Sequence, residues 1–417
     1  MPQIRHLRWW LAGLLLAATV INYLDRQTLS VLAPLLRDLF QMSNTEYSRI
    51  VFAFLLAYTF MQSGSGRILD WLGTRRGFSL TILWWSVAAM LHAAANSALH
   101  FGLCRFLLGL GEAGNWPGGV KAVSEWFPAR ERAFAIGLFN SGSCLGAVVA
   151  PPLVSWIALT WSWRAAFLLT GALGFLWLAA WLVLYRPARE HPWLTPQERA
   201  HVFSDARAEA APARPVRWVE LFRYRQAWGL VLARMLADPV WWFYVFWLPE
   251  YLRRERNFSL AMIGYFAWIP FLTADVGNFI GGGMSSWLVK RGWPVLRARK
   301  VVMFASAAVM IAGLPAVLTA SPALALGLIS LATLAYSSWA ANVLTLPADL
   351  FSGNIVASVS GLSGTGAGLG GMTFMLVVGV VVDRFSYVPV FSAAALMPLA
   401  AATIILLGIT GAVVQKE

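Results

Sequence analysis

Long apolar stretches separated by short polar ones make up almost the whole chain. Runs of about 20 mainly apolar residues, enough to cross a hydrocarbon core of roughly 30 Å, recur along its length. Spans are expected at residues 9–35, 47–68, 78–95, 99–125, 132–158 and 164–185, with six more between 226 and 412. These segments are too long and too evenly apolar to be tilted barrel strands. The pattern therefore predicts an all-α membrane protein with about twelve spanning helices.

The composition agrees with a chain folded in lipid. Of 417 residues, 59% are hydrophobic and 12% are charged, whereas about a quarter of the residues in soluble domains are charged. Both cysteines, Cys104 and Cys144, fall within predicted spans. We therefore expect no disulfide framework.

The distribution of the basic residues predicts which side of the membrane the loops and termini occupy. The formal net charge is +13, but the Lys and Arg residues are spread among short loops and form no single patch, so a nucleic-acid partner is not expected. Most of the 32 lie on one side of the predicted membrane map. Because positive loops stay in the cytoplasm, both termini are predicted to be cytoplasmic.

A polar segment divides the apolar pattern into two parts. Residues 186–225 contain several prolines among scattered charges. We therefore predict an N-terminal six-helix half at 1–185, a cytoplasmic linker at 186–225 and a C-terminal six-helix half at 226–417.

The two halves repeat each other. Residues 66–72 are echoed by residues 282–288, with Gly, Trp and Leu at the same spacing, and the glycines of spans 5 and 11 recur at one constant offset. Two parallel six-helix repeats are an architecture of secondary transporters, whose substrate site lies near the membrane midplane. The glycines themselves are interpreted as packing positions where helices approach closely.

Four ionisable residues lie inside predicted spans of the first half. Asp25 and Arg26 fall in span 1, while Arg105 and Glu112 fall in span 4, seven residues apart and so on nearly one helix face. Each such charge costs about 2.5–3.5 kcal/mol near the bilayer centre. One interpretation is a buried ion network that only holds helices together. We favour a transport site, because such a network seldom repays desolvation and Arg26 can donate forked hydrogen bonds to a substrate carboxylate.

The loop after span 2 resembles a known motif. Residues 66–77, Gly-Arg-Ile-Leu-Asp-Trp-Leu-Gly-Thr-Arg-Arg-Gly, are similar to the loop 2/3 motif of the major facilitator superfamily. The resemblance implies that Asp70, Arg75 and Arg76 are gating residues, whose charge contacts between helices hold one conformation. Without it, they would be a charged loop at the membrane surface.

A narrower resemblance rests on residues 22–26 (Asn-Tyr-Leu-Asp-Arg), Arg105 and residues 109–117. Together with residues 238–244 and 347–349, they closely resemble the anion:cation symporter family, which includes bacterial hexuronate and galactonate transporters and vesicular glutamate and sialic acid carriers. The hexuronate transporters are the nearest match, and the resemblance implies a bacterial inner membrane.

That resemblance also implies roles for single residues. Asp25 and Glu112 would carry the coupling protons, Arg26 would contact the substrate carboxylate, and Arg105 would tune the pair. The aromatic residues that it adds to the substrate site are Tyr23 and Tyr58.

Further polar or amphipathic residues lie at plausible midplane depth and could complete a polyol site. Each could equally serve as a hydrogen bond between helices. They are Gln62, Asn140, Ser338, Trp339, Ser360 and Ser363. Arg234 and Asp238 lie at i and i+4 in span 7, where we expect them to pair with each other.

Together with the resemblance, these observations predict a proton-coupled symporter that imports a small organic anion. In the leading interpretation the anion is a hexuronate or aldonate, and the protein is expected to be a monomer. A transporter or exchanger of an aromatic or dicarboxylic anion remains open, and a membrane receptor or enzyme is a remote alternative. No catalytic cluster, metal-ligand spacing or nucleotide-binding loop is found in the sequence, so no cofactor is expected.

Overall fold

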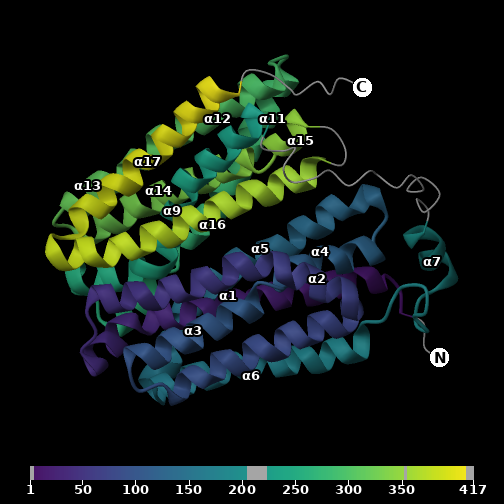
Figure 1. Cartoon of the computed structure of the whole chain (residues 1–417), viewed down its shortest axis with the longest axis horizontal. Helices are drawn as coiled ribbons and strands as arrows, with labels where there is room; N and C mark the ends of the chain where they lie inside the picture. The colour runs from purple at the N-terminus through teal and green to yellow at the C-terminus, as the bar shows by residue number, and fades with distance from the viewer. Residues whose placement is uncertain (1–3, 204–222, 352–354, 410–417) are drawn as a thin grey trace. The chain divides into compact units, whose positions relative to one another are not determined.

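The computed structural model describes residues 4–203, 223–351 and 355–409, and within them it leaves undescribed the side chains of residues 63, 70, 129, 130, 132, 133, 348 and 355–358. Helices dominate this part of the chain (Figure 1). They are α1 (Leu7–Phe40), α2 (Asn44–Leu91), α3 (Ala98–Glu112), α4 (Asn115–Trp126), α5 (Ala129–Thr160), α6 (Trp163–Leu184), α7 (Pro196–Val202), α9 (Arg225–Arg256), α10 (Leu260–Phe266), α11 (Ile269–Lys290), α12 (Val295–Val309), α13 (Gly313–Leu318), α14 (Pro322–Val343), α15 (Leu346–Leu350), α16 (Ile355–Arg384) and α17 (Tyr387–Gly408).

The predicted all-α membrane fold is confirmed. Among the described residues, ten helical segments are long and apolar enough to cross a membrane. The two other predicted spans are helical as well. Residues 47–68 form the first part of α2, and residues 99–125 are divided between α3 and α4.

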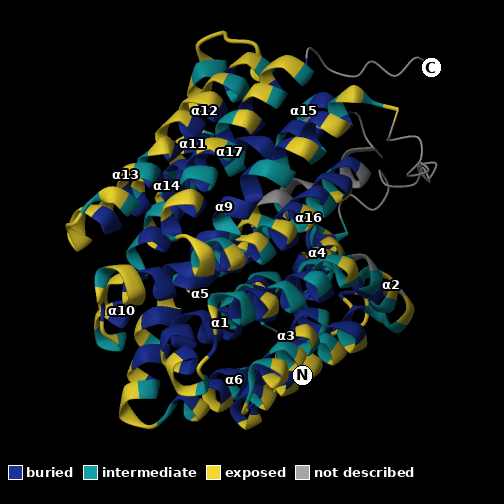
Figure 2. Ribbon diagram, turned by 60° about the vertical axis from the view of Figure 1, so that its left-hand side comes forward, coloured by how far each residue is buried: buried dark blue, intermediate teal, exposed yellow. Residues whose placement is uncertain are grey.

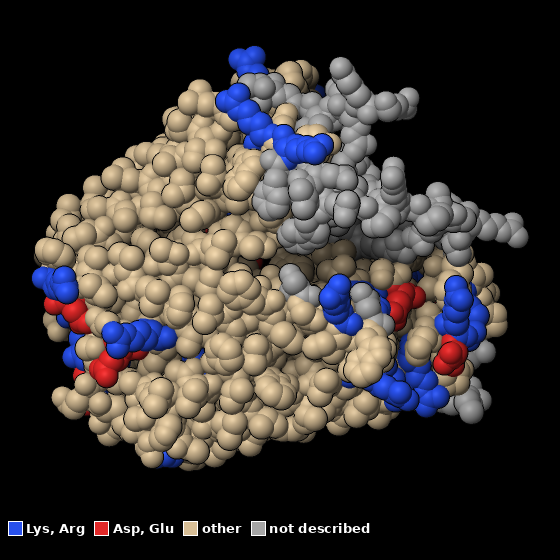
Figure 3. Space-filling model, viewed as in Figure 1, with Lys and Arg blue, Asp and Glu red and all other residues tan. Residues whose placement is uncertain are grey.

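Large apolar side chains on the outer faces of the helices indicate the environment that surrounds the protein. Phe279 of α11 is 81% exposed and Leu176 of α6 is 70% exposed, and many more exposed positions follow the helices in Figure 2. Most of the described surface visible in Figure 3 is uncharged, and its charged side chains lie in a few clusters. An apolar surface of this extent is unfavourable in water and suits lipid. The chain is a multi-pass membrane protein.

The described chain forms two compact units. Unit 1 comprises residues 1–41, 53–212 and 260–265, and unit 2 comprises residues 42–52, 213–259 and 266–417. In unit 1, α1 packs along α5 and α6; in unit 2, α9 packs along α16 and α17 in the same order. The boundaries predicted from the sequence, 1–185, 186–225 and 226–417, stay a prediction, because residues 204–222 lie outside the described residues.

Glycines let the leading helix of each unit approach its partner. A Cβ at Gly142 or Gly146 of α5 would lie 2.6 Å from a backbone carbonyl oxygen of α1. Gly366 and Gly370 of α16 approach carbonyl oxygens of α9 as closely. Any side chain there would push the two helices apart, so the packing interpretation of these glycines is confirmed. It is wrong for Gly137 and Gly361, where a Cβ would meet nothing within 4 Å.

The short helix α7 caps the first helix of unit 1. The residue before α1, His6, makes no side-chain cap. Instead, the Glu198 carboxylate of α7 accepts from the N–H groups of Leu7 and Arg8 at 3.1 and 3.2 Å and from Arg8 Nη1 at 2.9 Å. Arg8 Nε also donates to Glu131 Oε2 at 3.0 Å. This region of the polar linker therefore satisfies backbone donors that begin α1 and stabilises its N-terminal end.

Replacing Gly142 by Val should lower the thermal stability of the purified protein. The new side chain meets the α1 backbone, and overpacking of this kind costs about 1–3 kcal/mol. Gly137→Val is the matched control on the same helix, because its site is open. We expect a clear fall in melting temperature for Gly142→Val only. Equal effects at both positions would show that the α1–α5 approach does not limit stability.

Glu131 should make stability depend on acidic pH. Partial burial opposes ionisation, but hydrogen bonds from His201 and Arg8, with their charges, lower the pKa of Glu131 below its ordinary value. A depressed pKa stabilises the fold above the unfolded-state value, and this contribution is lost as pH falls through the folded-state value. The melting temperature of the wild type should be higher than that of Glu131→Gln near neutral pH. This difference in melting temperature should shrink below about pH 4. A difference independent of pH would contradict this role.

Candidate functional site

A buried ion pair joins α1 to α3 inside unit 1. Arg26 Nε and Nη2 both donate to Glu112 Oε2, at 2.9 and 2.8 Å. The Arg26 side chain is 1% exposed and that of Glu112 is 0% exposed. The structure thus brings together two of the four membrane charges singled out in the sequence, 86 residues apart.

Small residues position Glu112. It is the last residue of α3, and α4 resumes at Asn115 after a short break. A Cβ at Gly111 would lie 2.7 Å from Trp84, and one at Gly114 would lie 2.5 Å from Thr81. Because both neighbours belong to α2, the broken helix lies flush against α2 and holds the carboxylate at its turn.

Aromatic rings surround the guanidinium. The Arg26 Cζ atom lies 4.6 Å from the ring centre of Tyr23, 4.8 Å from that of Tyr58 and 5.1 Å from that of Phe54. Such faces attract a cation electrostatically and strongly so where water is absent. Asn22 Oδ1 accepts from Arg26 Nη2 at 3.1 Å. The sequence reasoning missed Phe54, although its spacing of four from Tyr58 places both rings on one helix face.

The other two membrane charges are arranged differently. Arg105 Nη2 donates to the backbone carbonyl of Arg26 at 2.8 Å, which ties α3 to α1. Asp25 is 2% exposed, and neither of its oxygens makes a hydrogen bond of good geometry with the described residues. The Thr170 hydroxyl lies near its carboxyl group, and the charges of Glu112 and Arg105 act on it. The structure therefore pairs Arg26 with Glu112 and leaves Asp25 as a second buried carboxyl group.

Two of the predicted polar contacts of unit 1 lie in open or half-buried positions. Gln62 is half-buried, and its backbone carbonyl accepts from Ser65. Asn140 is exposed, and its carbonyl accepts from Ser143. Neither side chain has a described bond to the ion pair, and their proposed substrate contacts stay predictions.

The predicted polar contacts of unit 2 occupy the helices α14 and α16. Ser338 is buried and bonded to a serine hydroxyl of α12, and Trp339 is fully buried in the core of the unit. The Ser363 hydroxyl donates to the carbonyl of Ser360 and accepts from Arg234 Nη1 at 3.2 Å. Their roles toward a substrate stay predictions.

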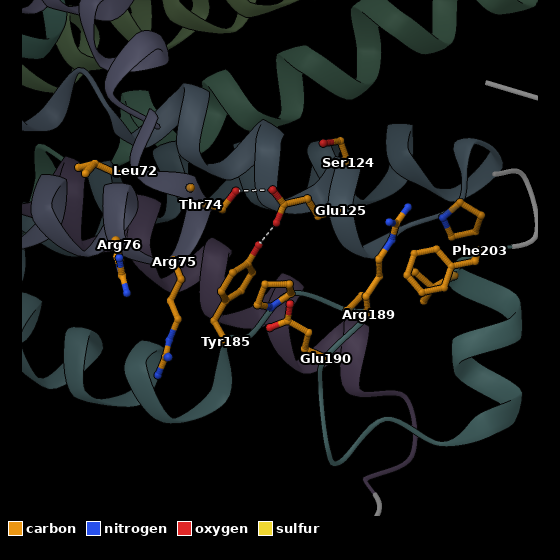
Figure 4. A pocket seen from close by; sticks show the side chains of 15 residues that line it. Leu72, Thr74, Arg75, Arg76, Ser124, Glu125, Tyr185, Arg189, Glu190 and Phe203 are labelled. Carbon is orange, nitrogen blue, oxygen red and sulfur yellow. Dashed lines mark hydrogen bonds between the residues drawn. The ribbon is translucent and has the colours of Figure 1, made fainter. Parts of the chain in front are cut away.

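The loop 2/3 motif borders a cavity of about 660 Å³ in unit 1 (Figure 4). Gly73 breaks α2 with φ 75°, a conformation that glycine adopts without strain. Arg75 and Arg76 follow it and line the cavity; Arg75 donates to the carbonyl of Leu182, and Arg76 is exposed. The side chain of Asp70 lies outside the described residues.

A carboxylate closes one wall of the same cavity. Glu125 of α4 accepts hydrogen bonds from Thr74, within the motif, and from the Tyr185 hydroxyl at the end of α6. Three helices of unit 1 therefore meet at this carboxylate. The sequence reasoning did not single out Glu125.

Neutralising the two buried carboxylates should affect stability in opposite ways. Glu112→Gln removes the partner of a buried arginine, and loss of one partner typically costs about 3–5 kcal/mol. Asp25→Asn keeps the shape and replaces a buried carboxyl group that has no described ion pair, so it should leave the fold as stable as the wild type or more stable. Melting temperatures of the two purified variants check this. A larger loss for Asp25→Asn would mean that Arg26 depends on Asp25 instead.

Comparison with known proteins assigns the family. The profile described as Major Facilitator Superfamily matches residues 15–372. The chain is 37% identical over 409 residues to the hexuronate transporter of Escherichia coli (strain K12), covering 97% of this chain and 94% of the relative. It is 38% identical over 315 residues to the galacturonate transporter of Dickeya chrysanthemi, covering 75% of this chain and 91% of that protein.

Solved structures share the fold at low sequence identity. A bacterial homologue of the human lysosomal transporter Spinster superposes with a TM-score of 0.71 at 19% identity, covering 97% of this chain and 96% of that one. The nucleoside transporter NupG superposes with a TM-score of 0.69 at 13% identity, covering 95% of this chain and 100% of that one. The chain therefore belongs to the major facilitator superfamily and is a membrane transporter, not an enzyme.

Proposed function

We propose that the protein is a proton-coupled symporter that imports a sugar acid, a hexuronate or an aldonate, by alternating access. The observation that carries this proposal is the fully buried Arg26–Glu112 ion pair. The named relatives, hexuronate and galacturonate transporters, support the class of substrate. We propose a bacterial inner membrane because these relatives are bacterial transporters, and cytoplasmic termini because of the distribution of the basic residues. We further propose that the protein is a monomer.

Exchange of carboxylates on Arg26 couples the proton to the substrate. While Glu112 is ionised, it occupies two donors of Arg26. A proton on Glu112 removes that negative charge and leaves a buried cation that needs a new partner, because an uncompensated charge in this environment is very costly. A substrate carboxylate supplies the partner through forked hydrogen bonds. Proton and anion together keep the site neutral, whereas either one alone does not.

The surrounding groups hold Arg26 while its partner changes. Tyr23, Tyr58 and Phe54 present ring faces to the guanidinium, and Arg105 holds the α1 backbone at Arg26. Asp25 is the second proton acceptor in this proposal, since it is buried in the same place. We call these three rings the aromatic cage. The cage keeps the guanidinium in one position, so that the incoming carboxylate meets a preorganised donor pair.

The gating role proposed for Asp70, Arg75 and Arg76 concerns the change of conformation. Arg75 and Arg76 line the cavity where α2, α4 and the end of α6 meet, so a rearrangement of that cavity would alter the packing of all three helices. The proton and substrate chemistry is assigned to the buried pair alone.

A second candidate function is the transport of an aromatic carboxylate by exchange, and the aromatic cage favours it. The three rings around Arg26 could also stack on an aromatic ligand. Uptake of uronates, aldonates and aromatic acids by one preparation would separate the two candidates.

Uptake of radiolabelled galacturonate and glucuronate into liposomes under an imposed pH gradient tests the function. We expect wild type to accumulate the acid when the outside is acidic. Glu112→Gln should lose this accumulation but keep exchange between preloaded compartments, because its neutral side chain imitates the protonated state. Glu255→Gln, at an exposed carboxylate of α9, is the matched control and should behave as wild type. Full proton-driven accumulation by Glu112→Gln would exclude the coupling role.

A further inference from the structure

Two apolar grooves share the exposed face of α2 in unit 1. The larger one, which we call the α6 groove, has a volume of about 510 Å³ and is lined by α2, η1 (His92–Ala94) and α6. The smaller one, the α3 groove, has a volume of about 300 Å³ and is lined by α2 and α3. Val87 and Leu91 line both grooves, and they are 44% and 43% exposed. These two residues therefore form a ridge with a groove on either side.

The packing of α6 on α2 fixes the direction of the α6 groove. A Cβ at Gly171 would lie 2.7 Å from Met90, and one at Gly174 would meet the Ser86 side chain. Residue numbers thus rise along α6 while they fall along α2, so the two helices are antiparallel. Arg164, the second residue of α6, therefore lies at the end of the groove where α2 ends and η1 begins.

This end of the groove lies near the membrane surface. The apolar helix α2 ends at Leu91 and α6 begins at Trp163. Just before α6, Trp161 is 60% exposed, and exposed tryptophan is enriched where a membrane meets water. Apart from Arg164, the residues that line the two grooves are apolar. The grooves therefore lead from the surface into the hydrocarbon core.

The length of each groove matches the thickness of one leaflet. Arg164 and Phe175 lie eleven residues apart on α6, and Leu80 and Leu91 lie eleven residues apart on α2. At a rise of 1.5 Å per residue, each stretch is about 16 Å long. Half of a hydrocarbon core is about 15 Å thick. Each groove can therefore accommodate one acyl chain along its whole length.

A hydrogen bond holds the α3 groove in shape. Trp84 Nε1 donates to the backbone carbonyl of Leu107 at 2.9 Å, and both residues line the groove. A Cβ at Gly111 would lie 2.7 Å from the same tryptophan, so α3 also packs closely on that ring. A groove with a fixed wall is already formed before a ligand binds, as is usual for small-molecule sites.

One positive charge lies at the surface end of the α6 groove. The Arg164 side chain is exposed, and its Cζ atom lies 4.3 Å from the ring centre of Trp163. Within the described part of the chain, Arg164 makes no ion pair and no acidic residue lines either groove. A guanidinium binds a phosphate group through charge-assisted hydrogen bonds. The ammonium group of a zwitterionic lipid, by contrast, finds no carboxylate among the residues that line the grooves.

We propose that the two grooves bind one diacyl phospholipid with an anionic headgroup. Its acyl chains occupy the α6 groove and the α3 groove, on either side of the ridge of Val87 and Leu91, and its phosphate binds Arg164. The site shares no residue with the buried Arg26–Glu112 pair, and it does not depend on the proposed function.

Native mass spectrometry of the full-length protein in detergent tests the class of lipid. Dioleoylphosphatidylglycerol should bind more tightly than dioleoylphosphatidylethanolamine, which has the same acyl chains and no net charge. It should also bind more tightly than single-chain lysophosphatidylglycerol, which leaves one groove empty. If either comparison lipid bound as tightly as dioleoylphosphatidylglycerol, the proposal would be overturned.

Replacing Arg164 tests the charged end of the site. Arg164→Gln should weaken binding of dioleoylphosphatidylglycerol about fivefold, the usual effect of one arginine near an anionic lipid, and leave the phosphatidylethanolamine affinity unchanged. Arg291→Gln is the matched control, because Arg291 is also exposed, lies 4.0 Å from the ring centre of Trp287 and lines neither groove. Unchanged binding in Arg164→Gln, or equal losses in the two variants, would contradict a specific phosphate contact.

A groove-filling variant tests the apolar part and does not rely on Arg164. Ala94 is exposed and lines the α6 groove, so Ala94→Phe should weaken binding of both diacyl lipids about tenfold, as expected when about two methylene groups lose their contacts. Lysophosphatidylglycerol should lose less, because the α3 groove stays open to its single chain. Ala179→Phe, at an exposed position of α6 outside both grooves, should bind as wild type does. Wild-type affinity in Ala94→Phe, or the same loss in Ala179→Phe, would overturn the assignment of the grooves.

Discussion

The buried pair of Arg26 and Glu112 is the constraint on which the rest of unit 1 depends. In a site this deeply buried, neither charge can be left without compensation, so a change at one partner has to be matched by a change at the other. The aromatic cage, the contact from Arg105 to the α1 backbone and the close packing of α3 and α4 on α2 all fix the positions of these two groups. Under the proposed function, this constraint makes proton binding and anion binding one event.

The two units repeat one backbone plan and carry different chemistry on it. Glycines of α5 and α16 set the approach of α1 and α9 in the same register. Side chains elsewhere on these helices can diverge, because the close approach needs small residues only where the helices touch. The Arg26–Glu112 pair of unit 1 is fully buried, whereas the Arg234–Asp238 pair of unit 2 is partly exposed.

Groups outside the spans also act on the helices that carry the site. Glu198, from the polar linker, satisfies N–H groups at the start of α1, the helix that carries Arg26. Glu125 joins the loop 2/3 motif to the end of α6. The linker and the loop are therefore part of the packing of unit 1.

The sequence by itself determined the all-α membrane fold, the internal repeat and the presence of charges in spans 1 and 4, because hydropathy and helical periodicity are local properties. Only the tertiary structure decided that Arg26 pairs with Glu112 and that its neighbour Asp25 does not share the pair, since consecutive helical side chains point in different directions. It also supplied Phe54, and it brought Glu198 to a helix start about 190 residues earlier in the chain. Such contacts depend on how helices cross, and that is set by packing between distant segments.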